Sequence, residues 1–410
     1  MKSSVGTSTK YASSFSYINN VLRSVLGDIE SLRETFELVV PRLEKQDDER
    51  RKEVREAQLT LDRALTNAKD SGLNLPQIID STKVIRGHER RLRRARLLFQ
   101  GNSIVSLVSR FDQFLAAIIR FLLRLHPERL DNLSIPYSDL SQVSSVEELR
   151  SRFIRNEVED LFRKAHDDQF KYLEGFIGPV NEEELWSALV EITERRNLHV
   201  HTGGRASRQY LDARKRVGIE KPEWLKEGSY LPVDMRYFND ACLTVSEMAF
   251  KITQTVMRKS FPKNFDSADK SLLGIGLDFL QRGQHQLAEI IFDYGAQLNQ
   301  KWTTNDGLRK TFLINKALAC KLQGKNDECL SILKPVDWSS AHPRYLIAVH
   351  ILRDELKLAT STLKILLKSN ELTERQIFEW PVFTSFRESE ECRTTFKEVL
   401  GRELGLSPSI

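Results

Sequence analysis

The sequence predicts an all-α protein, and three observations support this fold class. Apolar residues recur at helical spacing over long stretches, most clearly in 17–68 and 104–125. No segment alternates apolar and polar residues as a half-buried strand would. The last third of the chain divides into short helical pairs with glycine at the turns. At 410 residues, the chain is long enough for two or three domains with substantial cores.

Composition excludes several functional classes. The net charge of +5 is mild, so it permits an anionic partner without requiring one. The four cysteines form no CxxC pair and have no histidine cluster nearby, which indicates buried thiols in a reducing compartment and no structural zinc. The most apolar run, 114–123, is interrupted by Arg120 and is far shorter than the roughly 20 residues of a membrane span. We therefore expect a cytoplasmic protein that lies outside membranes and uses neither a metal nor a cofactor.

Residues 1–95 are expected to form a helical hairpin preceded by a loose tail. The first helix should begin near residue 17 and be broken or restarted at Pro41, and a charged helix that reaches about residue 68 should pair with it. Residues 70–76 should form the turn out of this hairpin. Beyond this turn, the stretch from Arg86 to Arg96 carries six arginines against one glutamate. Such a stretch either faces phosphate or is an exposed helix face whose long side chains cover apolar neighbours. The second interpretation is favoured, because no aromatic residue is interleaved for base stacking.

Residues 96–262 are expected to form a bundle of four or five helices. A proline should end the apolar helix 104–125, and a further helix should run from about residue 146 to about 172. The next helix should begin after Asn181, which has the character of an N-cap and precedes three glutamates. A long helix should then span 234–260.

The helix after Asn181 has a polar interruption in its apolar stripe. Its apolar residues lie on two adjacent faces, and those faces continue into Arg196, Asn197 and His201. Burying charge without a partner is costly. The three side chains should therefore form an internally paired network, or a seam between two protomers that encloses an anion.

The order Arg196-Asn197-x-x-x-His201, followed by Gly203-Gly204, resembles the Arg-polar-x-x-x-His signature of HEPN domains. These are small helical domains that dimerise and often act as metal-independent endoribonucleases. The resemblance covers about 95–260 and implies an HEPN-like bundle, a homodimer, and cleavage of RNA to 2',3'-cyclic phosphate ends. The surrounding residues that also carry it are Phe111 to Leu115, Tyr172-Leu173, Trp186 and Tyr210-Leu211.

The resemblance implies catalytic roles for Arg196, Asn197 and His201. His201 would transfer protons, Arg196 would stabilise the charged phosphorane, and Asn197 would orient the ring of His201 or contact ribose. Five residues on an ideal helix correspond to about 140°, so Arg196 and His201 of one chain converge poorly. Two chains related by a twofold axis would build a shared pocket.

Neighbouring residues are candidates for binding RNA or phosphate, because the segment 195–216 is rich in lysine and arginine. Arg195 also competes with Arg196 as the motif arginine, since Arg195 and His201 fit a looser spacing. The alternative function is a non-catalytic dimeric scaffold, in which the polar residues form a seam and the protein binds RNA or a protein partner. The candidate phosphate-binding residues are Arg195, His199, Arg205, Arg208 and Tyr210.

Residues 263–410 are expected to form helical repeats after a linker at 262–270. Small and large residues recur around the turn glycines Gly283 and Gly324, and this pattern resembles tetratricopeptide-like (TPR-like) solenoids over about 270–370. Trp380-Pro381 and Phe383 to Phe386 are expected to form a terminal cap. The resemblance implies a module that binds a protein partner or trigger and regulates the bundle. By analogy at the level of the fold alone, such fusions resemble bacterial toxins and antiviral defence effectors.

Overall fold

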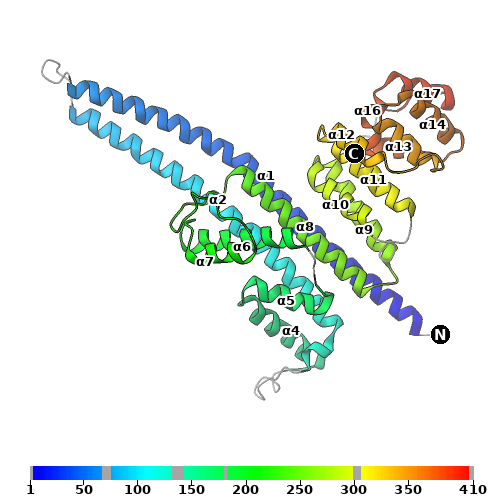
Figure 1. Ribbon diagram of the computed structural model, residues 1–410, viewed down its shortest axis with the longest axis horizontal. Helices are drawn as coiled ribbons and strands as arrows, with labels where there is room; N and C mark the ends of the chain where they lie inside the picture. The colour runs from blue at the N-terminus through cyan, green and yellow to red at the C-terminus, as the bar shows by residue number, and fades with distance from the viewer. Residues whose placement is uncertain (1–2, 67–74, 132–142, 180–181, 299–305, 406–410) are drawn as a thin grey trace. The chain divides into compact units, whose positions relative to one another are not determined.

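The computed structural model describes residues 3–66, 75–131, 143–179, 182–298 and 306–405. Within these ranges the chain is helical, and its β-type contact is an isolated antiparallel bridge between Arg205 and Tyr230 (Figure 1). The predicted all-α class is confirmed. In the part of the chain that is described, no helix combines the length and the apolar character needed to cross a membrane.

The chain divides into two compact units, residues 1–253 (unit 1) and 254–410 (unit 2). The sequence instead suggested three domains, with boundaries near residues 95 and 262. Helix α2 (Leu75–Leu125) runs continuously through residue 95, so the hairpin and the bundle share one helix and one unit. The second boundary falls inside helix α8 (Met235–Ser260), because its last turns pack with the repeats.

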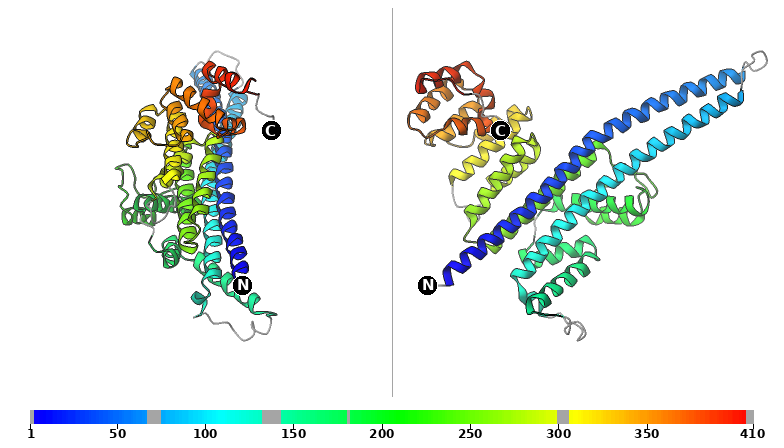
Figure 2. Two further views of the ribbon diagram at one scale, coloured as in Figure 1. Left: turned by 90° about the vertical axis from the view of Figure 1, so that its right-hand side faces the viewer. Right: turned by 180° about the vertical axis from the view of Figure 1, so that it is seen from behind.

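Helix α1 (Ser3–Thr66) lies antiparallel to α2, and the two form a hairpin (Figures 1 and 2). The hairpin expected within residues 17–68 is wrong, because residues 17–66 all belong to α1, and the expected loose tail is helical from Ser3. The expectation that Pro41 breaks this helix is wrong, because α1 continues through it. A proline inside a helix costs roughly 3 kcal/mol. Phe36 and Val40 next to it are fully buried, and the rings of Phe36 and Phe238 stack at 4.2 Å, so packing offsets that cost. Most of the segment 70–76, predicted as the turn out of the hairpin, lies outside the described residues.

The second half of α2 supplies much of the core of unit 1. Its apolar residues are buried from Ile104 to Leu123, including Phe111 and Leu115. The helix ends at Leu125 and a short 3-10 helix, η1 (Pro127–Leu130), follows it. The predicted end is confirmed, since proline has no N–H to continue the helical hydrogen bonds.

Two helices occupy the region where one was expected. Helix α4 (Val146–Phe162) is capped by Ser145, whose side chain accepts a hydrogen bond from the amide of Glu148. After a short break, helix α5 (His166–Ile177) begins with Asp167 and Asp168 in its first turn. Acidic residues favour a helix N-terminus, which explains why the chain starts a new helix here.

Three further helices complete unit 1. The predicted N-cap Asn181 lies outside the described residues, and the motif helix begins at Glu183. Ser207 caps the next helix, and Asp234 caps α8 by accepting a 2.8 Å hydrogen bond from the amide of Tyr237. The predicted helix at 234–260 is confirmed. The three helices are α6 (Glu183–His201), α7 (Arg208–Arg216) and α8.

Unit 2 is built from helical hairpins. The turn residues Gly283, Gly324 and Asp354 have φ values of 76°, 78° and 59°. Aspartate enters this left-handed region more readily than most residues, so the third turn lacks the glycine that marks the first two in the sequence. Helix α9 begins at Phe265, and most of the expected linker is therefore helical. The hairpins pair α9 (Phe265–Gln281) with α10 (His285–Gln297), α11 (Asp306–Leu322) with α12 (Asn326–Leu333), and α13 (Pro343–Leu352) with α14 (Leu356–Lys368).

The chain then folds back on the last hairpin. The 3-10 helix η2 (Pro381–Phe383) contacts α13, helix α17 (Glu390–Leu400) contacts α14, and Phe383 and Phe386 are buried. The expected cap segment thus covers the apolar surface of the third hairpin. The elements of this segment are α15 (Glu374–Glu379), η2 (Pro381–Phe383), α16 (Thr384–Arg387) and α17 (Glu390–Leu400).

Glycines inside the helices of unit 2 allow close helix packing. Gly276 lies against the ring of Phe292, and a Cβ at Gly295 would lie 2.6 Å from the ring of Phe312. We expect Gly295→Ala to destabilise the protein by about 1–3 kcal/mol, because the added methyl group overpacks the contact between α10 and α11. The measurement is thermal unfolding followed by circular dichroism.

Gly27 in α1 is the matched control, because a Cβ there would meet no atom within 4 Å. Gly27→Ala should leave stability unchanged or raise it by about 0.4–1 kcal/mol. Equal melting temperatures for the two variants would contradict the assigned role of Gly295.

Candidate functional site

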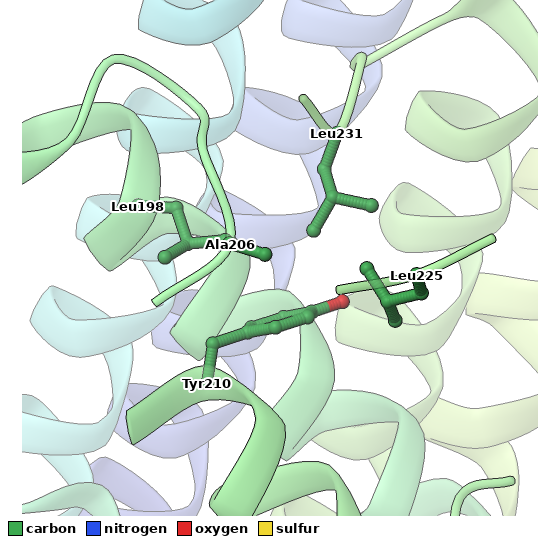
Figure 3. Close-up of a cluster of buried hydrophobic side chains, with 5 residues drawn as sticks. All are labelled: Leu198, Ala206, Tyr210, Leu225 and Leu231. Atoms are coloured by element: carbon green, nitrogen blue, oxygen red, sulfur yellow. The ribbon is translucent and has the colours of Figure 1, made fainter. Parts of the chain in front are cut away.

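Helix α6 packs against both α2 and α7. Its apolar residues are buried, including Leu189, Val190 and Ile192. At its C-terminal end, a small apolar cluster joins α6 to α7 and to the loop before α8, as Figure 3 shows. This cluster determines the path of the chain after the motif. Its members are Leu198, Ala206, Tyr210, Leu225 and Leu231.

The glycine pair after the motif ends the helix. Gly203 and Gly204 have φ values of 61° and 79°, in the region that glycine adopts without strain. The amide of Gly204 donates a 3.0 Å hydrogen bond to the carbonyl of Leu198, which closes the last turn. A Cβ on Gly204 would lie 2.7 Å from Cε1 of His199. The pair therefore turns the chain and leaves room for the ring of His199.

Glu191 is a buried carboxylate at the centre of a polar network. Its Oε1 accepts hydrogen bonds from Nη2 of Arg195 (2.6 Å) and from the hydroxyl of Tyr210 (2.6 Å). Its Oε2 accepts a hydrogen bond from the hydroxyl of Tyr237 (2.8 Å). Arg195 also donates to the carbonyl of Pro232 (3.0 Å), and its guanidinium lies 4.2 Å from the ring centroid of Tyr237. Each buried charge thus has the several partners that it needs.

Two of the residues predicted to bind phosphate therefore lie in the interior. Tyr210 is 0% exposed and Arg195 is 8% exposed. Burial raises the pKa of Tyr210 and of Tyr237, and the charge of Glu191 raises both further, so both hydroxyls remain protonated donors. This corrects the prediction, because Arg195 and Tyr210 join α6 to α7 and α8 instead of facing a ligand. Arg196 is the motif arginine that stays accessible.

Arg196 lies on another side of α6 and forms part of a partly open cluster. Its Nη2 donates to Oδ2 of Asp112 on α2 at 3.3 Å, and Oδ1 of the same carboxylate accepts a 2.9 Å hydrogen bond from Nε2 of His166 on α5. The three side chains are 23%, 25% and 16% exposed for Arg196, Asp112 and His166. Three helices thus bring a guanidinium, a carboxylate and an imidazole together.

Reasoning from the sequence missed Asp112 and His166. Asp112 is the one carboxylate in the apolar stretch 104–125, and that acidic residue is the signal that could have found it. His166 lies 54 residues away from Asp112 in the chain, so only the fold brings them together. One of the three polar residues in the apolar stripe, Arg196, is therefore explained by an internal pair.

His199 is a half-buried contact between α6 and α2. Its Nε2 lies 3.2 Å from the carbonyl oxygen of Leu231, which only accepts, so Nε2 carries the proton. A Cβ on Gly101 of α2 would lie 2.8 Å from Nδ1. Burial lowers the pKa of His199; the bond to Leu231 opposes this shift and the charge of Arg195 adds to it. A neutral, confined imidazole is a poor phosphate ligand, which differs from the role predicted for His199.

The remaining predicted site residues lie at or near the surface. His201 at the end of α6 is exposed, and so are Arg205 and Arg208. Arg205 donates a 3.1 Å hydrogen bond to the carbonyl of Gly228. The side chain of Asn197 is half-buried and has no hydrogen-bond partner among the residues described. Arg196 and His201 lie about 140° apart around α6, so a single chain does not gather them into one pocket.

A group of potential metal ligands in the described part of unit 2 has another explanation. Glu289, Cys320 and Glu328 lie close enough together to hold an ion. However, the carboxylate of Glu289 already accepts hydrogen bonds from Lys325 (2.9 Å) and Gln323 (2.7 Å). A lysine therefore already supplies the positive charge, and the group is an ion pair between neighbouring hairpins.

Comparisons of the chain with protein-family models, curated proteins and solved structures gave no match. The candidate function therefore rests on the geometry of the α6 region.

The buried network makes a strong prediction about stability. Glu191→Ala leaves the charge of Arg195 and two tyrosine hydroxyls without their acceptor, so it should cost about 3–5 kcal/mol. Glu194→Ala on the same helix is the control, because Glu194 makes no hydrogen bond or ion pair with a described residue. The control should stay within about 0.5 kcal/mol of wild type. Urea unfolding measures both, and equal midpoints for the two variants would disprove the structural role of Glu191.

His199 also predicts a dependence of stability on pH. Its folded pKa lies below its unfolded value of 6.5, so the unfolded chain binds the proton first and stability falls as pH drops through that value. His199→Gln keeps a donor for Leu231 but does not titrate. Between about pH 7.5 and about pH 5.5, the melting temperature of wild type should fall more than that of the variant. Parallel pH profiles would show that His199 titrates alike in both states.

Proposed function

We propose that residues 96–262 form a metal-independent endoribonuclease of the HEPN type that acts as a homodimer. The observation that carries this proposal is the selective exposure of the motif residues. Arg195 and His199 have internal hydrogen-bond partners, whereas the side chain of Arg196 is 23% exposed and His201 is exposed. Arginine and histidine placed only for stability would be expected to join the buried network, as Arg195 does.

These two residue types suit RNA cleavage without a metal. The 2'-hydroxyl of ribose attacks the adjacent phosphorus, the bond from phosphorus to the 5'-oxygen breaks, and a 2',3'-cyclic phosphate and a 5'-hydroxyl form. A base takes the proton of the 2'-hydroxyl, and an acid protonates the leaving oxygen. We assign the proton transfer to His201 and stabilisation of the phosphorane to Arg196. Asn197 lies one turn before His201, where it can orient the imidazole.

The complete site is assigned to two chains, because Arg196 and His201 point in different directions from α6. A twofold axis near the C-terminal end of α6 would place His201 of one protomer beside Arg196 of the other. Val200 offers an apolar contact for such an interface, since it is 50% exposed next to His201. RNA bound across the interface would then meet both groups.

His166 is a second candidate for proton transfer within one chain. Its Nε2 is held by Asp112, so its Nδ1 is the nitrogen left to exchange a proton. The same carboxylate holds Arg196, which places a titratable ring and a permanent cation at one cluster. In this variant of the proposal, the Asp112 cluster alone carries out cleavage and the dimer is not required.

The competing function is a non-catalytic dimeric scaffold that binds RNA or a protein partner. The ion pair between Arg196 and Asp112 favours this alternative. A guanidinium that is neutralised by a carboxylate attracts phosphate less strongly than a free one. Cleavage would then require RNA to displace or share the partner of Arg196.

Unit 2 is assigned a regulatory role as a TPR-like module. Its hairpins turn at left-handed residues and pack closely at Gly276 and Gly295, which are features of such repeats. A groove lined by residues of α9, α11 and α15, with Trp380 at its edge, offers a surface for a protein partner or trigger. A cytoplasmic toxin or antiviral effector that stays silent until triggered fits this architecture by analogy.

The decisive experiment follows cleavage of end-labelled RNA by the purified full-length protein. Activity should persist in EDTA and yield 2',3'-cyclic phosphate ends, because the proposed chemistry uses side chains alone. His201→Ala should lower the rate by about 10²–10⁴ while the protein still melts like wild type. Arg196→Lys should also be impaired, since lysine cannot contact two phosphate oxygens with a planar fork.

His126→Ala is the control, because His126 is an exposed histidine beyond the end of α2 and should leave the rate unchanged. If His166→Ala abolishes RNA cleavage while His201→Ala remains active, the cleavage would be assigned to the Asp112 cluster. Wild type that binds RNA as a dimer but never cleaves it would favour the scaffold. Light scattering of the same samples should give the mass of two chains.

A further inference from the structure

Tyr230 occupies a fixed position opposite Arg205. The two residues form the isolated antiparallel bridge, and two backbone hydrogen bonds hold the segments together beside it. These bonds run from the amide of Ala206 to the carbonyl of Ser229 and from the amide of Leu231 to the carbonyl of Gly204, both at 2.8 Å. These contacts hold the backbone of Tyr230 in place.

The ring of Tyr230 packs beside His199 and so lies close to α2. The two rings meet edge to face, with centroids 6.4 Å apart and planes at 80°. His199 in turn rests on Gly101 of α2. Arg96 and Arg93 lie five and eight residues before Gly101 on the same helix. The basic stretch of α2 and the loop after α7 thus meet at Tyr230.

The charges of three arginines act on the Tyr230 hydroxyl. Burial raises its pKa, while the positive charges of Arg96, Arg93 and Arg205 oppose that shift. Arg96 has carboxylate partners on α1, and Arg205 donates to a backbone carbonyl. Arg93 is exposed and makes no hydrogen bond or ion pair with any described residue. Arg93 and Arg205 have no carboxylate partner among the described residues, so an anion bound here would stabilise these two charges.

We propose that Tyr230, Arg93, Arg96 and Arg205 form a binding site for the phosphate backbone of single-stranded RNA. We name these four residues the Tyr230 site. Guanidinium groups and a phenol hydroxyl together supply the donors that a phosphodiester accepts. Of the four, only Arg205 was a candidate phosphate ligand from its sequence neighbourhood; Tyr230 was not identified, and Arg93 and Arg96 belonged to a stretch interpreted as an exposed face.

An extended polyanion fits this surface better than a single phosphate. Arg86, Arg90 and Arg93 follow one another at spacings of four and three residues, so they line one side of α2, and all three are exposed. This row extends over roughly 10 Å of helix axis and leads to Tyr230. The inference rests on the proposed function only in its choice of RNA; the site would capture the strand, and the α6 residues would cleave it.

The test measures RNA binding separately from cleavage. A labelled single-stranded RNA with 2'-O-methyl groups lacks the attacking hydroxyl, so fluorescence anisotropy with the full-length protein reports affinity alone. Arg93→Glu and Arg205→Glu should each weaken binding by about tenfold at roughly 50 mM salt. Each should also make the salt dependence less steep, by about 0.7 in the logarithmic slope for every phosphate that the variant no longer binds. Tyr230→Phe should weaken binding by a smaller factor, because only one hydroxyl is removed.

Arg91→Glu is the matched control. Arg91 is exposed on the same helix but lies about 200° from Arg93, and its Nε donates to the carbonyl of Gly87. The change in net charge is identical, so an affinity within about twofold of wild type supports a local site. Equal reductions in affinity for Arg91→Glu and Arg93→Glu, or no binding of the RNA by wild type, would overturn the Tyr230 site.

The outcomes for the two proposals are distinguishable. If binding of the 2'-O-methyl RNA depends on Arg93 and Arg205 but the wild-type protein does not cleave unmodified RNA, the Tyr230 site is supported and the nuclease is rejected. If Arg93→Glu and Arg205→Glu still cleave unmodified RNA and bind the 2'-O-methyl RNA with wild-type affinity, the nuclease is supported and the Tyr230 site is rejected.

Discussion

The buried carboxylate of Glu191 is the interaction on which the candidate site depends. A single side chain on α6 accepts hydrogen bonds from Arg195 on the same helix, Tyr210 on α7 and Tyr237 on α8. A buried ion with this many donors permits few alternative arrangements, because any rotation of α6 would leave charges unpaired. The network therefore fixes which side of α6 faces the core. Arg196 and His201 are oriented by that choice, although neither touches Glu191.

Helix α2 links the parts of unit 1 that the sequence had suggested as separate domains. Its apolar half forms the core, Asp112 holds Arg196 and His166, and Gly101 receives the ring of His199. Its basic half carries Arg93 and Arg96, whose charges act on Tyr230. Because one continuous helix carries all of these contacts, a strand of RNA bound along the basic half would have a defined position relative to α6.

The motif segment divides its polar residues between two tasks. Arg195 and His199 are held by internal partners, while Arg196 and His201 keep access to solvent. Residues adjacent in sequence can take such different roles because successive side chains on a helix point about 100° apart. The pairing of Arg196 with Asp112 moderates its charge, so an anion would bind Arg196 only by displacing or sharing that carboxylate.

The sequence by itself determined the helical class, the ends of the apolar helix at Leu125 and of α8 at Ser260, and the glycine turns at Gly283 and Gly324. These features depend on local periodicity, on proline and on glycine, which act within a few residues. Only the tertiary structure decided that α1 continues through Pro41, that Arg195 and Tyr210 are internal, and that Asp112 and His166 join Arg196. Each of these depends on partners distant in the chain, such as Phe238 for Phe36 and Glu191 for Tyr210. Local patterns carry no record of such partners, because burial and pairing are set by which surfaces meet after the helices have formed.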